Sequence, residues 1–543
     1  MSKVILQISL DSLSRSATLP VLDLTLVATP GRFRLIDCAQ YLHHGTLSIH
    51  EFTEFPIAQC AYTAISYVWR GNSVDVSAVR LTFSVAGAED GDPVGVDVLK
   101  HVCTAALREK TNYIWLDRLC IMQTSKDDKH WQISQMFQIY RRCALCVVLP
   151  GGVQRLVELH ERTAWINRGW TLQEALAPPR VEVIYAWEWR SGMYYGAFRG
   201  SITELIPGES AMTPLRAVLS LQSFGLTTFF PSMNSPHITF RTEIFGAPND
   251  SSPNTTTEQT TEVVTFMLKY ALGDTFENFD EQAPAIWRSA LFRTSSRPVD
   301  MVFSIMGLFG VTLDTRKFHK DDRLGATIAL MQEILRGGGR ASWLGLAPYL
   351  PVNPRLSTIP IFPRTHIEGL VSLEAKSQGI DEQERRPQRV ALLDVRGVSM
   401  PSGSMDNSGY LTITRKAIRI YPSTRTQHLR EDQHDHRVSS ATPPLYLKAI
   451  NHTEWVFDRD LMQDPDQNSP RTFAILLGWF NQFSQKGVWD GPRHIGALLV
   501  REHAPDKFHV ESYFELNDGL ERWVLGSWEE HTLCIGGPSS DVT

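Results

Sequence analysis

The sequence has few cysteines, no excess of basic residues and no long apolar run. Its seven cysteines among 543 residues, an odd number lying mostly in apolar segments, are typical of reduced, buried thiols. The 53 Lys and Arg residues against 59 Asp and Glu give a net charge of −6, which argues against a protein that coats nucleic-acid phosphates. No uncharged apolar stretch approaches the roughly 20 residues of a membrane helix, and the N-terminus lacks a signal-peptide pattern. We therefore expect a cytoplasmic protein with no membrane span and no nucleic-acid partner.

Common catalytic and metal-binding motifs are missing as well. The chain has no G-x-x-x-x-G-K-[ST] loop for nucleoside triphosphates, no H-E-x-x-H and no G-x-S-x-G. Cys143 and Cys146 form a lone C-x-x-C pair inside an apolar strand pattern, without the second pair or the histidines of a zinc site. We expect no metal site and no bound cofactor.

Strand-like and helix-like segments alternate along the first part of the chain. Buried strands are predicted at 61–69, 112–117, 143–149 and 181–187, with helices at 95–110, 125–144 and 167–177 between them. This alternation predicts an α/β domain with a parallel sheet flanked by helices. Ligands of such sheets bind at the carboxyl ends of the strands, where Trp69 and Asp117 stand.

The remaining regions differ in their patterns. Residues 1–31 are weakly patterned and are predicted to be an N-terminal extension. Residues 191–345 are predicted to be a mainly helical region, with a clear amphipathic helix ending at Gly337. From 346 to 543, short alternating segments with regular turns predict a separate, mostly antiparallel β domain, either a sandwich or a barrel.

Several blocks of the first part resemble the heterokaryon-incompatibility (HET) domain of fungi. The blocks are RFRLIDC (32–38), YTAISYVWRG (62–71), the run from Tyr113 to Gly152, and RGWTLQEALAPPR (168–180). Met122 departs from the family pattern, which usually has asparagine at this position. The segment from Thr294 to Val311 resembles the one that follows the domain in many of these proteins. The resemblance implies a HET domain over 32–190, extended over 191–345, and a role in fungal non-self recognition (an innate immunity) that ends in programmed cell death.

The resemblance also implies a distant relation to TIR domains, and with it a TIR-like or flavodoxin-like sheet. Many TIR domains cleave NAD at the nicotinamide bond with the glutamate of a W-x-x-x-E motif. Here the motif runs from Trp170 to Glu174, so Glu174 is the implied catalytic residue and NAD is a possible substrate. Such cleavage needs an oxocarbenium-like centre to be stabilised, which one carboxylate in a partly dry pocket can do without a metal. Trp170 and Glu174, at i and i+4, would share one helix face.

Residues near the strand ends are predicted to bind the substrate, together with Trp170. They are Ser66, Tyr67, Trp69, Arg70, Asp117 and Arg118. Tyr67 and Trp69 have core packing as their alternative. Asp117 either orients a ribose or Arg118, or caps the turn that follows.

The charged and aromatic candidates have alternatives too. Arg70 and Arg118 either hold the dinucleotide phosphates or are ordinary surface arginines. Glu174 either acts on the ribose or pairs with Arg168 or Arg180, and Trp170 either walls a pocket or belongs to the core.

Two further hypotheses concern the domain as a whole. Cys120, with His130 or His101 as base, could make a Cys–His hydrolase, although a buried structural thiol is the simpler interpretation. The protein could also be no enzyme but a signalling adaptor that self-associates as a homo-oligomer or binds an unknown protein partner. The sequence leaves the enzyme and adaptor interpretations open.

Overall fold

The computed structural model of the protein divides into two compact units. The first unit comprises Met1–Gly273, Phe292–Arg323 and Arg364–Leu373, and the second unit comprises Asp274–Leu291, Leu324–Pro363 and Glu374–Thr543. The structure describes residues 2–537 with gaps at 16–17, 55–59, 75–80, 197–198, 224, 232–235, 247–254, 274–278, 347, 349, 366–370, 373–389, 395–398, 424–443, 458–469 and 484–492. Within these described residues, no helix is both long and apolar enough to cross a membrane.

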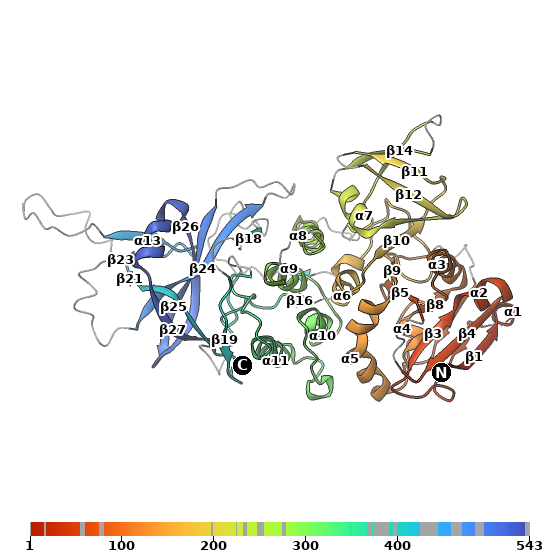
Figure 1. The fold of residues 1–543 in the computed structure, drawn as a ribbon, viewed down its shortest axis with the longest axis horizontal. Helices are drawn as coiled ribbons and strands as arrows, with labels where there is room; N and C mark the ends of the chain where they lie inside the picture. Colours follow the sequence, from red (N-terminus) through yellow and green to blue (C-terminus); the bar gives the residue numbers. More distant parts are fainter. Residues whose placement is uncertain are drawn as a thin grey trace, which may run out of the picture. The chain divides into compact units, whose positions relative to one another are not determined.

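Twelve strands of the first unit form one mixed sheet (Figure 1). They are β1 (Ser2–Ser9), β3 (Phe33–Asp37), β4 (Thr46–Phe52), β5 (Tyr62–Tyr67), β8 (Tyr113–Trp115), β9 (Leu145–Leu149), β10 (Val181–Ala186), β11 (Gly192–Tyr195), β12 (Arg199–Ile206), β13 (Ser210–Pro214), β14 (Leu226–Phe230) and β15 (Ile238–Arg241). Their order across the sheet is β1-β4-β3-β8-β5-β9-β10-β13-β12-β11-β14-β15. The segment predicted as an N-terminal extension therefore supplies an edge strand, β1.

The four central strands β8, β5, β9 and β10 are parallel, as the alternating sequence pattern predicts. The prediction of a parallel sheet is wrong for the flanks, because β1, β4 and β3 on one side and β13 on the other are antiparallel to their neighbours. Connection length explains the difference. Only the seven-residue helix α2 (Cys38–His44) and the left-handed Gly45 join β3 to β4, whereas a parallel crossover needs a dozen residues or more.

Helices of the first unit pack against its sheet or against one another. They are α1 (Leu10–Ser14), α2, α3 (Val96–Arg108), α4 (Asp117–Cys120), α5 (Lys126–Arg142), α6 (Thr171–Leu176), α7 (Leu215–Gln222), α8 (Thr255–Ala271) and α10 (Asp300–Met306). The helices predicted at 95–110 and 125–144 correspond to α3 and α5. Ser125 caps α5 by accepting a hydrogen bond from the main-chain N–H of Asp128 at 3.2 Å, as its position before the helix suggests.

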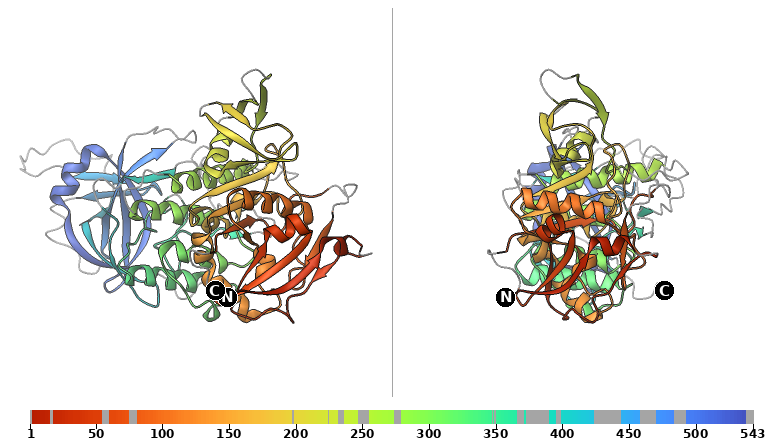
Figure 2. Two further views of the ribbon diagram at one scale, coloured as in Figure 1. Left: turned by 45° about the vertical axis from the view of Figure 1, so that its right-hand side comes forward. Right: turned by 90° about the vertical axis from the view of Figure 1, so that its right-hand side faces the viewer.

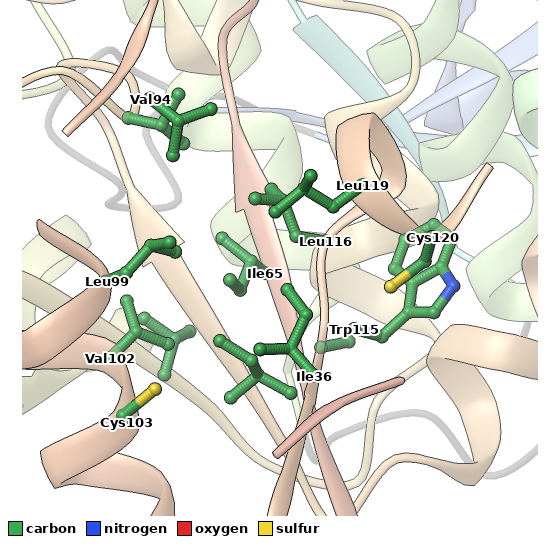
Figure 3. Close-up of a cluster of buried hydrophobic side chains, with 14 of the residues drawn as sticks. Ile36, Ile65, Val94, Leu99, Val102, Cys103, Trp115, Leu116, Leu119 and Cys120 are labelled. Atoms are coloured by element: carbon green, nitrogen blue, oxygen red, sulfur yellow. The ribbon is translucent and has the colours of Figure 1, made fainter. Parts of the chain in front are cut away.

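The centre of the sheet is packed on both faces. Leu99 and Val102 of α3 lie on one side of Ile65, and Trp115 lies on the other side (Figure 3). The Trp115 ring meets the ring of Tyr140 from α5 edge to face at 5.5 Å. Helices thus shield both faces of the parallel strands from water, and the residues at the strand ends are left to contact ligands or loops.

The middle of the chain is less helical than its sequence suggests. The described residues of 192–241 form β11 to β15 and one short helix, α7. The prediction of a mainly helical region is therefore wrong there, apart from α7, and agrees with the helices after 254. The reason is a two-residue period, since burial alternates along β14 (Leu226–Phe230), a run of β-branched and aromatic residues. Two small sheets complete the unit. They are formed by β2 (Val21–Leu22), β6 (Thr82–Val85) and β7 (Val94–Gly95), and by β16 (Arg364–Thr365) and β17 (Val371–Ser372).

The second unit contains the mostly antiparallel sheet predicted for the C-terminal part. Its seven strands are β18 (Val390–Asp394), β24 (Thr472–Phe483), β25 (His494–Ala504), β26 (Lys507–Asn517), β27 (Glu529–Ile535), β20 (Leu411–Arg419) and β19 (Gly403–Met405), in this order. An additional pairing of β20 with β24 closes five strands into a ring. Figure 2 draws these strands in cyan to blue. A smaller sheet of β21 (Tyr421–Pro422), β23 (Glu454–Phe457) and β22 (Leu445–Lys448) and the helices α9 (Phe279–Leu291), α11 (Arg323–Arg336) and α13 (Glu521–Ser527) accompany it.

Candidate functional site

Glu174 lies in α6 with its carboxylate at the carboxyl end of the central strand β5. The Ser66 hydroxyl donates a hydrogen bond to Glu174 Oε2 at 2.5 Å. Ser66 Oγ in turn accepts one from the indole Nε1 of Trp165 at 2.8 Å. Trp165 begins the short 3-10 turn Trp165–Asn167 that precedes α6. A directed chain of hydrogen bonds from Trp165 through Ser66 therefore orients the Glu174 carboxyl group.

The environment of Glu174 favours its neutral form. Only 7% of the residue is exposed, and burial raises the pKa of its carboxyl to about 8. The hydrogen bond from Ser66 opposes this rise, and the nearby carboxylate of Asp117 adds to it. The guanidinium of Arg293 also lowers the pKa, but less than the other groups. A carboxyl group that is desolvated and perturbed in this way, at a strand end, is a candidate for a functional role.

Asp117 forms a second polar contact at the same strand ends. Its Oδ1 accepts a hydrogen bond from the Tyr67 hydroxyl at 2.5 Å and another from the main-chain N–H of Arg118 at 2.5 Å. Burial raises the pKa of Asp117, although both of these hydrogen bonds oppose the rise. Asp117 is the first residue of α4, a helix without a side-chain cap at its start, and its carboxylate fixes the phenol of Tyr67.

The two arginines predicted to hold phosphates differ in exposure. Arg118 is 1% exposed and its guanidinium stacks on the rings of Tyr67 and Trp69, with Cζ at 5.4 and 4.7 Å from the ring centroids. Arg70 is exposed and donates from Nε to the carbonyl oxygen of Asp90 at 2.9 Å. Arg118 is therefore no ordinary surface arginine.

Trp170 caps α6 and lies half-buried against the main apolar core. Its indole Nε1 donates to Asp300 Oδ2 at 3.4 Å, and burial raises the pKa of Asp300 to about 6. Arg180, one of the partners expected for Glu174, pairs instead with Glu109 and Glu182.

The segment after residue 290 supplies site residues that the sequence did not single out individually. Arg293 Nη1 donates to the carbonyl oxygen of Arg168 at 3.0 Å and to Thr171 Oγ1 at 2.8 Å. The main chain of Thr294 exchanges hydrogen bonds with Asn167 and Gly169, just before α6. The one signal for this contact was the resemblance of the 294–311 segment to the segment that follows HET domains.

The Cys–His hydrolase hypothesis finds no matching geometry. Cys120 is buried, and burial raises the pKa of its thiol to about 12. His130 Nδ1 is hydrogen-bonded to Thr315 Oγ1 at 2.8 Å, and His101 Nδ1 to Ser210 Oγ at 2.8 Å. Across the part of the chain that the structure describes, no group of three or more His, Cys, Asp or Glu side chains could hold a metal ion.

Comparison with known proteins finds similarity to one family over part of the chain. Residues 62–156 match the family model described as heterokaryon incompatibility protein (HET). An alignment over 134 residues with the vegetative incompatibility protein HET-E-1 of Podospora anserina is 28% identical, and it covers 22% of this chain and 9% of that relative. No solved structure matches the chain. The matched segment contains Ser66 and Asp117, whereas Trp170 and Glu174 lie beyond it.

Proposed function

Since the chain contains a heterokaryon incompatibility (HET) domain, we propose that it acts in heterokaryon incompatibility by TIR-like hydrolysis of NAD. In this proposal the protein works in the cytoplasm, responds to a protein partner or trigger, and its activity leads to programmed cell death. Glu174 is the catalytic residue. The observation that carries the mechanism is the desolvated Glu174 carboxyl held by Ser66 at the end of β5.

The chemistry of NAD cleavage suits one buried carboxyl. The nicotinamide ring is already cationic and leaves as a neutral molecule, so the reaction needs little acid catalysis. The ribose carbon acquires positive charge as the bond breaks, and the ionised form of Glu174 would stabilise it. The low exposure of Glu174 strengthens this attraction, because water screens the charges poorly there.

The strand order supports a TIR-like or flavodoxin-like assignment. Taken along the chain, β5, β8, β9 and β10 are the first to fourth parallel strands, and they lie in the order 2-1-3-4. Flavodoxin-like sheets begin with this order and bind ligands at the carboxyl ends of the strands next to the first one. Ser66 lies near the end of β5, the first of these strands, and Asp117 follows the neighbouring β8.

A second candidate function is that of a non-enzymatic signalling adaptor, which self-associates or binds a partner. The observation that favours it is that the candidate site residues are paired with one another. Tyr67 pairs with Asp117, and Ser66 pairs with Glu174. In an adaptor these contacts would serve only to stabilise the domain, and the exposed helix faces would carry the function.

The experiment that separates the two candidates is nicotinamide release from NAD by the purified protein, with and without a crowding agent. Glu174→Gln should lower the rate at least about a hundredfold, because it keeps the shape but removes the charge. Glu182→Gln is the matched control, since Glu182 is likewise buried with a raised pKa but pairs with Arg180 away from the site.

Three outcomes are informative. Loss of release in Glu174→Gln alone supports the enzyme. No release by any form, together with an incompatibility response that survives Glu174→Gln in cells, supports the adaptor. Equal release by wild type and Glu174→Gln would place the active site elsewhere.

A further inference from the structure

An acidic loop covers the end of the strand that carries Ser66. The acidic loop comprises residues 86–93 between β6 and β7 and contains Glu89, Asp90 and Asp92. Its residues 90–92 lie against the segment 69–71, directly after β5. The main-chain N–H of Asp92 donates to the carbonyl oxygen of Trp69 at 2.9 Å.

The groups that hold the acidic loop are hydrogen-bond donors suited to anions. The main-chain N–H of Gly71 donates to Asp92 Oδ2 at 2.6 Å, and Arg70 Nε donates to the carbonyl oxygen of Asp90 at 2.9 Å. The guanidinium of Arg118 donates through Nη1 to the carbonyl oxygen of Asp92, and through Nη2 to that of Trp69 at 3.1 Å. Two guanidinium groups and one main-chain N–H thus converge at one strand end.

The hydrogen-bonding groups of the Arg118 guanidinium are only partly satisfied by the acceptors around it. Its charge is almost fully buried, and its guanidinium hydrogen bonds go to two neutral carbonyl oxygens while its plane lies on two aromatic rings. The Asp117 carboxylate is close enough to interact with this charge, but its Oδ1 already accepts hydrogen bonds from the Tyr67 hydroxyl and the Arg118 main-chain N–H. Within the described part of the chain, its Nε has no hydrogen-bond acceptor. A phosphate oxygen would supply both the missing acceptor and a full negative charge, and arginine binds phosphates through paired N–H groups.

The acidic loop approaches this guanidinium closely because residue 91 is glycine. A Cβ at Gly91 would lie 2.3 Å from Arg118 Nη2 and 2.9 Å from Trp69 Cε3. Any side chain at this position therefore disrupts the contact between the loop and the Arg118–Trp69 stack, by moving either the loop or the guanidinium.

We propose that Arg70, Arg118 and the Gly71 N–H form a phosphate-binding subsite that the acidic loop occupies in the resting protein. The loop acts as an autoinhibitory plug, and a ligand phosphate replaces its carbonyl oxygens and the Asp92 carboxylate. The repulsion between that phosphate and the loop's carboxylates drives the loop away. The identification of the ligand as the pyrophosphate of NAD rests on the proposed function, whereas the subsite itself does not.

Binding of inorganic pyrophosphate, followed by calorimetry, tests the subsite without any turnover. Gly91→Ala should bind pyrophosphate about tenfold more tightly than wild type, because the cost of displacing the loop is removed. Asp92→Ala, which deletes the acceptor of the Gly71 N–H, should act in the same direction and serves as the second loop variant. Asp90→Ala is the matched control, since it removes the same charge from the loop but leaves the carbonyl contact to Arg70 in place.

Hydrogen exchange and an NAD titration complete the test. In Gly91→Ala and Asp92→Ala the amides of residues 88–95 should exchange faster, and Arg70→Gln in either variant should reverse the gain in pyrophosphate affinity.

Pyrophosphate affinity that is equal in wild type, Gly91→Ala and Asp92→Ala would overturn the proposal, as would a gain in Asp90→Ala of the same size. Tighter pyrophosphate binding without nicotinamide release from NAD would leave the subsite standing and count against the NAD hydrolase. Nicotinamide release from NAD, together with a pyrophosphate affinity that the loop variants do not change, would support the NAD hydrolase and overturn the subsite.

Discussion

Asp128 and Glu174 are buried carboxyl groups of the same sheet unit, and they differ in how their charges are compensated. Asp128 is fully buried and accepts hydrogen bonds from Arg34 Nη1 at 3.0 Å and from the main-chain N–H groups of Gly31 and Met122 at 2.7 and 2.8 Å. Glu174 has the uncharged hydroxyl of Ser66 as its hydrogen-bonded partner. The first arrangement ties β3 to α5, whereas the second leaves Glu174 with a desolvated carboxyl group whose pKa is raised to about 8. The comparison teaches that burial alone does not set the state of a carboxyl group, and that the nature of its partners decides whether its pKa is raised as in Glu174.

The largest expected effect is the loss of stability in Asp128→Asn. The substitution leaves the fully buried Arg34 guanidinium without its closest counter-charge, and breaking such a pair costs about 3–5 kcal/mol. Urea unfolding at pH 7 measures it. Asp127→Asn, one residue earlier and exposed, is the control and should cost about 0.5 kcal/mol or less. If Asp128→Asn were as mild as its neighbour, the two carboxyl groups would not differ in the way proposed.

The next effect is a pH-dependent gain of stability in Glu174→Gln. Glu174 binds its proton more tightly in the folded protein, where its pKa is about 8, than in the unfolded chain, where it is near the ordinary 4.5. The wild type therefore loses stability relative to the variant as the pH rises from about 4.5 to about 8, at about 1.4 kcal/mol per pH unit. Urea unfolding of both proteins between pH 5 and 9 tests this. Parallel curves would show that Glu174 is ionised throughout and is compensated like Asp128.

A smaller effect is expected in the pH profile of NAD hydrolysis. In the proposed mechanism the ionised form of Glu174 acts on the ribose, so kcat/KM should rise with pH and level off above a pKa of about 8. Between pH 7 and the plateau the increase should be about tenfold. A profile that falls over this range would mean that the neutral acid is the active form and that Glu174 donates a proton.

The sequence predicts the helices and strand ends that carry these carboxyl groups, but not the contacts between residues far apart in the chain. Hydrophobic periodicity and capping residues locate α3, α5 and α6, and strand ends bring Ser66 and Asp117 to one edge of the sheet. The Ser66–Glu174 hydrogen bond joins residues 108 positions apart, and the Arg293–Thr171 bond joins residues 122 apart. Such contacts follow from packing, which no local pattern encodes. The strands over 192–241 were missed because short alternating runs there compete with a helical pattern.

The burial of Arg118 is a second case in which the sequence was insufficient. Its neighbours Asp117 and Leu119 follow a strand end, where an arginine is equally compatible with a surface position. Its side chain is buried because the acidic loop, which includes Gly91, closes over it from elsewhere in the sequence. The position of that loop depends on one glycine and four hydrogen bonds to residues distant in the sequence. It is therefore set by tertiary packing and not by a local sequence pattern.

The smallest effect separates the two hydrogen bonds that Ser66 makes. Ser66→Ala removes the donor that lowers the pKa of Glu174, so the pKa should rise above 8 by up to about one unit. Trp165→Phe removes only the hydrogen bond from the indole to Ser66 and leaves the Ser66–Glu174 contact, so it should not shift the pKa in the same way. Each variant is compared with its double variant that also carries Glu174→Gln, and the difference in their free energies of unfolding is measured against pH. The pH at which this difference stops changing gives the pKa of Glu174 in the folded variant, and the measurement requires no enzymatic activity. An equal shift in the two variants would mean that Ser66 orients the carboxyl group only when the indole holds it, and that the chain from Trp165 acts as one unit.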